Sequence, residues 1–324
     1  MHETNSIPFP GSAASRRHQA TKKFSNKAAG FDEPIQLPRD DEQRGQWQSA
    51  NKAWWESTPM RYDWREKLAE IPGSKEYFNE IDRRFLTSVR KYMPWRAVPF
   101  EELLPFDELR DKDVLEIGVG HGTHAQLISS RSRSFTGIDL TSRAAEMTSQ
   151  RLRLFNIPGK VLEMDAEQMS FPDGSFDFIW SWGVIHHSAD TRRVLQEMNR
   201  VLRVNGTSTV MVYHRSWWQY YVVWLLKGAI QGKVGMHGNL HHVSQAAIDG
   251  AIARCYLPRE WRAVTDGLFK IESIRIYGIK TDVIPLAHGR VKSVAEALVP
   301  DAFARFLTNR MRMGSFLVAH MRKK

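Results

Sequence analysis

Residues 114–124 read VLEIGVGHGTH, and this stretch decides the fold. Its short apolar run through Glu116 predicts a buried strand, and Gly118, Gly120 and Gly122 predict a tight turn into a helix. Glycine accepts the backbone angles of such a turn and lets a ligand lie against the main chain. The spacing differs from the G-x-G-x-x-G of dinucleotide sites, where a pyrophosphate sits on the helix. An acidic Glu116 instead suits a ligand that carries positive charge, although a purely structural turn fits this stretch alone.

Carboxylates follow the next two apolar runs. Asp139 ends FTGID with Leu140 beside it, and Asp165 and Ala166 follow KVLEM. A carboxylate at the end of the second strand is placed to accept both hydroxyls of a ribose. Asp165 is suited to accept a hydrogen bond from an adenine amino group, with backbone contact at Ala166. Together with the glycine turn, these residues predict a nucleoside-binding site.

The surrounding chain alternates between short apolar strands and helices. DVLEIG, SFTGID, KVLEM, SFDFIWSW and GTSTVMVY are the expected strands, with helical stretches at 142–155 and 191–202 between some of them. Two later strands are expected in KIESIRIYG and GSFLVAHM. This alternation predicts an α/β fold whose parallel sheet is covered on both faces.

Composition and periodicity divide the chain into five parts. We expect a disordered or extended segment over 1–45, a helical cap over 46–108, a ligand-binding core over 109–214, an aromatic-rich lid or interface insertion over 215–268, and C-terminal strands with a helical insertion over 269–324. Within the cap, Trp54 and Trp55 are expected to pack over the ligand, because tryptophan buries a large area.

The ordered set VLEIGVGHGTH, GIDL, MDAEQMSFPDGSFDFIWSWGVIHHSAD and EMNRVLRVNG resembles the motif series of class I S-adenosylmethionine-dependent methyltransferases, and most closely the type-11-like group. The resemblance covers about residues 109–213. It implies a Rossmann-like, seven-stranded, mostly parallel sheet and S-adenosyl-L-methionine as cofactor. The positions that match cofactor-binding residues of the family are Glu116, Gly118, Gly120, Asp139 and Asp165. We expect four further residues at the cofactor, which are Gly122, Leu140, Ala166 and Trp182. One departure is Asn205–Gly206, where many members carry Pro-Gly, and asparagine tolerates the geometry of that turn.

Residues after the fourth strand are expected to face the reacting methyl group. Methyl transfer needs alignment, a dry pocket and, for some acceptors, a base. His186 and His187 are the candidate bases, and because adjacent residues point in different directions we expect one of them, preferably His186, to face the acceptor. The alternative is that one histidine satisfies a backbone group and neither is catalytic. Asp190 is expected to cap the helix that begins at Thr191.

Candidate acceptor contacts follow the fifth strand. Tyr213 and His214 end that strand, and Trp217 and Trp218 open the segment SWWQYYVVWLLKGAI. This segment is compatible with a substrate pocket, a homodimer surface, contact with a lipid interface, or simple packing on the core. The histidines at 237, 241 and 242 lack nearby carboxylates or thiols, so no metal site is predicted.

The composition of the chain restricts the partners, the disulfides and the membrane segments that can be expected. The 324 residues carry a formal net charge of +10, which favours anionic partners, although the charge is diffuse. A single cysteine, Cys255, excludes an intramolecular disulfide and suits a reducing compartment such as the cytoplasm. The N-terminal residues lack the apolar core of a signal peptide, and the strongest apolar run, 217–230, is too short to span a bilayer.

Three functions remain open at this point. The first is a methyltransferase acting on a small molecule or biosynthetic intermediate, at an oxygen, nitrogen or carbon atom. The second is an RNA- or protein-directed methyltransferase, favoured by the positive charge. The third is a non-catalytic protein that binds S-adenosylmethionine. Ser181–Trp182–Gly183–Val184 is not the Asn/Asp-Pro-Pro-aromatic motif of adenine amino methylases, and Arg254 precedes Cys255 where cytosine carbon-5 methylases need Pro-Cys.

Overall fold

The computed structural model describes residues 27–62, 67–223, 225–226, 240–286 and 290–324. They form an eight-stranded sheet of order β3-β2-β1-β4-β5-β8-β7, in which β6 pairs with β5 outside this path. The strands are β1 (Asp113–Ile117), β2 (Ser134–Asp139), β3 (Lys160–Glu163), β4 (Phe176–Trp182), β5 (Leu202–His214), β6 (Cys255–Tyr256), β7 (Phe269–Tyr277) and β8 (Phe316–Lys323). Within this sheet β8 alone runs in the opposite direction to the other strands, so the predicted mostly parallel α/β sheet is confirmed.

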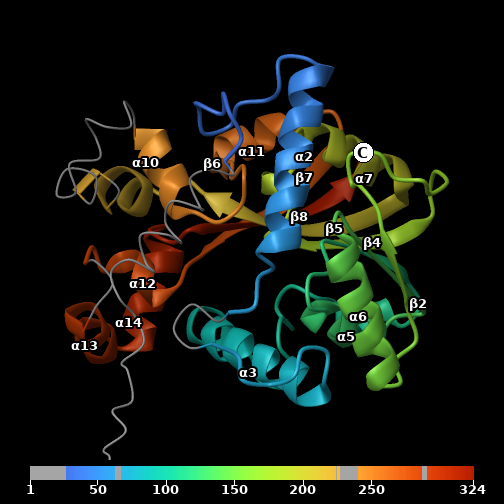
Figure 1. The fold of residues 1–324 in the computed structure, drawn as a ribbon, viewed down its shortest axis with the longest axis horizontal. Helices are drawn as coiled ribbons and strands as arrows, with labels where there is room; N and C mark the ends of the chain where they lie inside the picture. Colours follow the sequence, from blue (N-terminus) through green and yellow to red (C-terminus); the bar gives the residue numbers. More distant parts are fainter. Residues whose placement is uncertain (1–26, 63–66, 224, 227–239, 287–289) are drawn as a thin grey trace, which may run out of the picture.

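Helices cover both faces of the sheet (Figure 1). The side chains of β1 alternate: Leu115 and Ile117 pack into a cluster with Val194 and Trp261 of α7 (Thr191–Val201) and α11 (Pro258–Thr265). Val114 packs on the opposite face, in a cluster that includes residues of α3 (Lys75–Tyr92) and α5 (Thr123–Ser129). This two-sided burial explains why the β1 sequence is a nearly continuous apolar run.

The two helices expected in the core are present. The helix α6 spans Ser142–Leu154 and α7 spans Thr191–Val201, within a residue of the predicted bounds. The Asp190 carboxylate accepts hydrogen bonds from the backbone N–H groups of Arg192 and Arg193, as its predicted capping role requires. Both helices could be predicted from the sequence, because each begins at a side-chain cap and presents one apolar face to the sheet.

The N-terminal boundary differs from the expectation. The helix α2 spans Asp41–Ser57, so it begins inside the segment expected to be disordered or extended, because the side chain of Asp40 accepts a hydrogen bond from the Gln43 N–H and caps it. Residues 27–40 precede α2 as a strap that is ordered against the C-terminal half. Its Lys27 Nζ donates to the Gly250 carbonyl at 2.6 Å, and Pro34 accepts from the Cys255 N–H at 3.1 Å.

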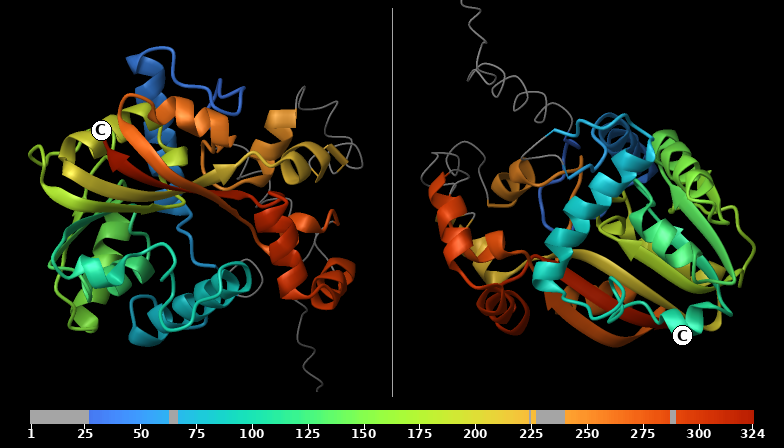
Figure 2. Two further views of the ribbon diagram at one scale, coloured as in Figure 1. Left: turned by 180° about the vertical axis from the view of Figure 1, so that it is seen from behind. Right: turned by 90° about the horizontal axis from the view of Figure 1, so that it is seen from below.

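Short helices form a lobe beside the sheet, which we call the C-terminal lobe (Figures 1 and 2). It contains the π-helix η2 (Trp217–Val223), α12 (Lys280–Val283), α13 (Arg290–Leu298), α14 (Asp301–Arg305) and the π-helix η3 (Phe306–Arg310). The separate helix α10 (Leu240–Ala247) precedes β6, and α4 (Phe106–Leu109) precedes β1. None of the helices in the described ranges combines the length and apolarity needed to cross a lipid bilayer.

Candidate cofactor and acceptor site

The glycine turn joins β1 to α5 with positive backbone angles. Gly118 has φ +80°, and Gly122, with φ +79°, is the residue before α5. A Cβ atom on Gly118 would overlap the Val184 side chain, so the loop after β4 packs directly on the turn. At Gly120 a Cβ would meet no atom within 4 Å. The turn is therefore packed at Gly118 and open at Gly120, where a ligand can approach the backbone.

Glu116 lies beneath this turn in an aromatic environment. It is 1% exposed, and its Oε2 atom has no hydrogen-bond partner among the described residues. His124 Nδ1 lies 3.8 Å from its other carboxylate oxygen. Burial, with a smaller contribution from Asp139, raises the pKa of Glu116 well above its ordinary value. An added cation beside this carboxyl group would reverse that shift.

Asp139 and Asp165 follow neighbouring strands at the carboxyl edge of the sheet. Asp139 Oδ2 accepts from the Gly120 N–H at 3.2 Å, and its Oδ1 accepts from the Thr141 N–H at 3.0 Å. Asp165 Oδ1 accepts from the Glu167 N–H at 2.8 Å. Because β1 pairs with β2 and β2 with β3, the glycine turn and both carboxylates lie along one sheet edge. Burial raises the pKa of Asp139, while the hydrogen bonds from Thr141 and Gly120 act in the opposite direction.

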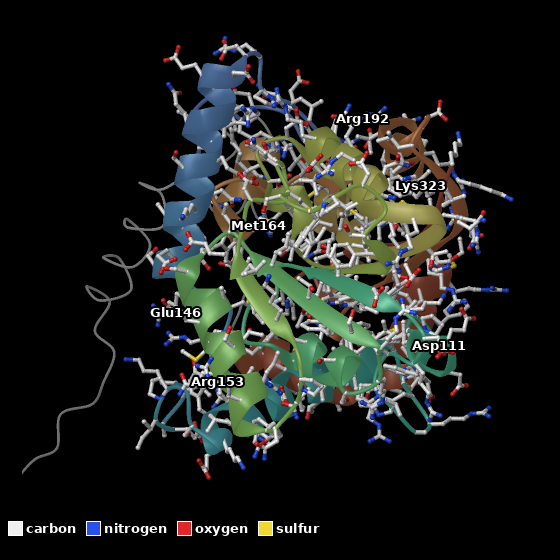
Figure 3. All side chains as sticks on the ribbon, turned by 90° about the vertical axis from the view of Figure 1, so that its right-hand side faces the viewer. Asp111, Glu146, Arg153, Met164, Arg192 and Lys323 are labelled. Atoms are coloured by element: carbon white, nitrogen blue, oxygen red, sulfur yellow. The ribbon has the colours of Figure 1, made fainter. Side chains whose placement is uncertain are left out.

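The helix α2 covers this edge of the sheet and contacts it through polar side chains. Gln48 Nε2 donates to Asp165 Oδ1 at 2.8 Å, and Lys52 Nζ lies 2.6 Å from Glu163 Oε1. Figure 3 views this flank of the molecule, with Met164 directly after β3 and α6 carrying Glu146 and Arg153 below α2. The polar residues of α2 were missed by the sequence analysis, because only its tryptophans stand out in composition.

Aromatic rings line the end of β4. Trp182 stacks on Trp180 with ring centroids 5.4 Å apart and an interplanar angle of 7°. The Phe100 ring meets Trp182 edge-on at 5.0 Å. Trp182 is half-buried and Trp180 is fully buried, so of these two rings only that of Trp182 keeps accessible surface.

His186 and His187 lie in the short 3-10 helix η1 (Ile185–His187) and are both buried. The His187 Nδ1–H donates to the Ile252 carbonyl at 2.6 Å, which leaves Nε2 as the acceptor nitrogen of that ring. His186 packs its ring 4.1 Å from that of Tyr213, and neither of its nitrogens has a partner among the described residues. Burial lowers the pKa of His187 to about 4 and that of His186 well below its ordinary value, so both rings are neutral at pH 7.

The family model of the methyltransferase domain matches residues 115–210. This range contains the glycine turn, both carboxylates and the two histidines. Residues 115–210 form a class I methyltransferase domain. Its cofactor is S-adenosylmethionine, as the sequence resemblance implied.

The named relatives match about a third of this chain. The chain is 30% identical to 27-O-demethylrifamycin SV methyltransferase of Amycolatopsis mediterranei over 96 residues, 29% of this chain and 35% of that protein. It is 36% identical to phthiotriol/phenolphthiotriol dimycocerosates methyltransferase of Mycobacterium tuberculosis over 102 residues, 31% of this chain and 37% of the other. With demethylmenaquinone methyltransferase of Thermotoga maritima the identity is 31% over 119 residues, 36% of this chain and 49% of that one. The chain therefore spans less than half the length of each relative.

One solved structure shows that the fold extends beyond the domain. Geranyl diphosphate C-methyltransferase from Streptomyces coelicolor superposes with a TM-score of 0.50 and covers 86% of this chain and 98% of its own. At 17% sequence identity this likeness concerns the fold alone.

The residues of the methyltransferase domain fit S-adenosylmethionine. The unpartnered carboxylate oxygen of Glu116 suits a cationic ligand, and the bare face of Gly120 leaves room against the backbone. Leu140 and Ala166 are half-buried beside Asp139 and Asp165 respectively. Glu116 would hold the charged end of the cofactor and the two aspartates its adenosine.

Three of the expected acceptor residues, His214, Trp217 and Trp218, have contacts or exposure that the structure describes. His214 is buried, and its Nδ1–H donates to the Gly314 carbonyl at 2.8 Å, because β5 ends beside the turn that leads into β8. Trp218 packs against Val283 and Met313 in the C-terminal lobe. Trp217 is 51% exposed on that lobe. Of the four predicted acceptor residues, Tyr213 alone forms ring contacts with His186 and His187.

The histidines near α10 are engaged individually. His241 Nδ1 lies 3.2 Å from the Tyr220 hydroxyl, and His242 Nε2 lies 3.0 Å from Asp32 Oδ1. The histidine at position 237 lies outside the described residues. Within the described ranges, no three His, Cys, Asp or Glu side chains are grouped to hold a metal ion.

Proposed function

We propose that this chain is an enzyme that transfers a methyl group from S-adenosylmethionine to a small-molecule acceptor. The observation that supports it best is one continuous edge of the sheet. Glu116, the glycine turn and Asp139 lie at one end of this edge, and the loop with His187 packs on the turn through Val184. A bound cofactor and a proton acceptor would therefore lie side by side.

His187 is the better candidate for the base, in preference to His186. The Ile252 carbonyl fixes its tautomer, so Nε2 carries the lone pair that can accept a proton from an acceptor hydroxyl, amine or acidic carbon. Trp55 of α2 meets the His187 ring edge-on at 5.0 Å, which orients the ring further and shields it from water. S-adenosylmethionine supplies a methyl group on a positively charged sulfur, and the chain needs only to align the acceptor and receive its proton.

Acceptors of the matched relatives support the small-molecule assignment. The names of those proteins refer to a rifamycin, a phthiotriol and a demethylmenaquinone. These are metabolites rather than nucleic acids or proteins, and we propose the same broad class for this chain.

The proposal is tested with methyl-labelled S-adenosylmethionine and fractionated metabolites, followed by mass analysis of products. We expect label in a metabolite fraction with wild-type protein and none with Asp139→Ala, which should also lose cofactor binding by calorimetry. The proposal fails if wild-type protein does not bind the cofactor, or if label enters only RNA or protein.

A further inference from the structure

The C-terminal lobe exposes a face of large apolar side chains, which we call the apolar face. It consists of Val291, Val294, Leu298, Phe303, Phe306 and Met311. Most of the exposed large apolar side chains among the described residues lie between Trp217 and Met311, in this lobe or in the segment that leads to it. Scattered exposed apolar residues are ordinary, but their concentration on one lobe marks a binding surface.

The outer stripe of α13 is exposed although the helix is firmly docked. Val291, Val294 and Leu298 recur at helical spacing, and Val291 and Leu298 are 73% and 77% exposed. Ala295 of α13 and Val299, directly after the helix, pack against the cluster of Val283, Ile284 and Met313. The exposed side chains of the helix are separate from these contacts and are not needed for packing of the lobe.

The exposed residues of η3 extend this face. Trp217 Nε1 donates to the Met311 carbonyl at 3.3 Å, and the Met311 N–H donates to the Phe306 carbonyl at 3.0 Å. Figures 1 and 2 show α12, α13 and α14 grouped together beside the sheet in each view. The helices that carry the exposed aliphatic and aromatic groups thus lie together in one lobe, and such groups are those that interfacial helices present to a bilayer.

Positive charge borders the apolar face. Arg310 and Arg312 are exposed on either side of Met311, and within the described part of the chain neither forms an ion pair. Arg90 and Lys91 line an open groove of about 510 Å³ between α3 and α14, opposite Asp301. Cations that surround an apolar patch match an anionic lipid bilayer, where apolar groups enter the interface and arginines meet headgroups.

We propose that the apolar face docks the protein on an anionic lipid bilayer. A symmetric second copy fits the face less well, because pairing it with itself would bring the arginine-rich borders together. The π-helix η2 begins three residues after β5, so the lobe joins the site beside Tyr213. The corollary, that the acceptor is an amphipathic molecule of the bilayer, rests on the proposed methyltransferase function.

Vesicle sedimentation tests the docking surface. Wild-type protein should bind vesicles of phosphatidylcholine with phosphatidylglycerol, and bind less as salt is raised or phosphatidylglycerol is omitted. Val291→Asp/Leu298→Asp should lower the partition constant by about tenfold or more. Arg310→Gln/Arg312→Gln should remove the preference for phosphatidylglycerol. The matched control is Ile71→Asp/Val204→Asp, at positions 78% and 83% exposed outside the lobe, which should bind as wild type does.

Three outcomes would overturn the proposal. The first is wild-type protein that fails to sediment with anionic vesicles at low salt, and the second is an α13 double variant that binds as well as the control. The third is a dimer, seen by sedimentation without vesicle binding, that the α13 variant dissociates; the face would then be a protein interface. Asp139→Ala should retain vesicle binding while it loses the cofactor, so failure of the docking surface is distinguishable from failure of the methyltransferase assignment.

Discussion

Glu116 and His187 are buried titratable side chains, and in both cases burial favours the neutral form. They differ in how their polar atoms are satisfied. Glu116 keeps an oxygen without a partner among the described residues, whereas the His187 Nδ1–H is bound to a carbonyl. The first arrangement favours a cationic ligand, and the second orients an acceptor nitrogen for a proton.

Replacing Glu116 by glutamine should have opposite effects on the stability of the fold and on the affinity for the cofactor. Below the unfolded pKa the carboxyl group is protonated in both states, so wild type and Glu116→Gln should melt alike near pH 4. As pH rises, the unfolded chain loses this proton while the folded chain retains it, and wild type should become less stable than the variant. Cofactor affinity should nevertheless fall about tenfold or more, because the charge-assisted contact is lost. Thermal melts across pH and calorimetry measure both effects, and a variant that binds as tightly as wild type would contradict the role of Glu116.

Replacing His187 by glutamine tests the proposed base. With an acceptor in hand, His187→Gln should lower kcat by about 10²–10⁴-fold and leave the cofactor dissociation constant nearly unchanged. His214→Asn is the matched control, since His214 is also buried but bonds Gly314 instead of facing the site. If His187→Gln kept full activity and His186→Asn did not, the assignment would pass to His186.

The pH profile gives an independent check on His187. A proton acceptor must be neutral, and burial holds the pKa of His187 at about 4. We therefore expect kcat/KM to stay level from neutral pH downward and to fall only as the pH approaches 4, while the protein remains folded by circular dichroism. A midpoint near the ordinary histidine pKa of about 6.5 would mean that another group is the base.

At the scale of elements, the helix α2 contacts both the proposed cofactor-binding edge of the sheet and the proposed base. One face of the helix reaches Glu163, Asp165 and His187 through Lys52, Gln48 and Trp55 respectively. The position of the helix depends on its first turn, where Asp40 provides the cap. The element that covers the cofactor edge is thus held by a short polar contact at its start.

Asp40→Ala should loosen α2 selectively. Loss of an N-cap costs about 1 kcal/mol, so amide hydrogen exchange over 41–57 should accelerate while β1 and β4 stay protected. Ser74→Ala removes the equivalent cap of α3, where the Tyr77 N–H donates to the serine at 3.1 Å, and should accelerate exchange in α3 instead. Equal acceleration of both helices in both variants would show that the caps act only through global stability.

Local patterns predicted the core elements but not the contacts of the accessory parts. Strands buried on both faces of a sheet have continuous apolar sequences, which predicts β1, β2 and β4. Helices that begin at a side-chain cap show the capping residue in the sequence, which predicts α6 and α7. The roles of His214 and Trp218 depend instead on Gly314 and on Val283, which lie far along the chain. The carboxylates proposed for the cofactor site were predicted from their place after strands, whereas Gln48 and Lys52 carry no comparable signal.

At the scale of the whole molecule, one buried cation joins three distant segments. Arg254 is fully buried and donates to the carbonyls of Gln36 at 2.8 Å, Ser188 at 2.5 Å and Ala189 at 2.6 Å. Its guanidinium also lies 5.4 Å from the Phe31 ring centroid. The strap, the loop after η1 and β6 therefore share one anchor.

Arg254→Met should destabilise the molecule by about 2–4 kcal/mol, because the methionine fills similar space and leaves three carbonyls without a donor. Urea unfolding measures the loss, and protection of residues 27–40 from proteolysis should fall first. Arg192→Met provides the comparison, since Arg192 lies at the surface and bonds carbonyls of Val264 and Asp266 only. A similar loss in both variants would argue against a central anchor.

The antiparallel strand β8 lies between β5 and β7, although β7 precedes it in the chain. Within the described residues β7 pairs with β8 alone, so during synthesis β7 emerges from the ribosome before its neighbour exists. Until β8 arrives, the edge of β5 keeps its hydrogen-bonding groups open and its apolar side chains uncovered. The nascent polypeptide thus passes through a stage prone to aggregation, and chaperone capture should be strongest for ribosome-bound chains halted between the end of β7 and the start of β8.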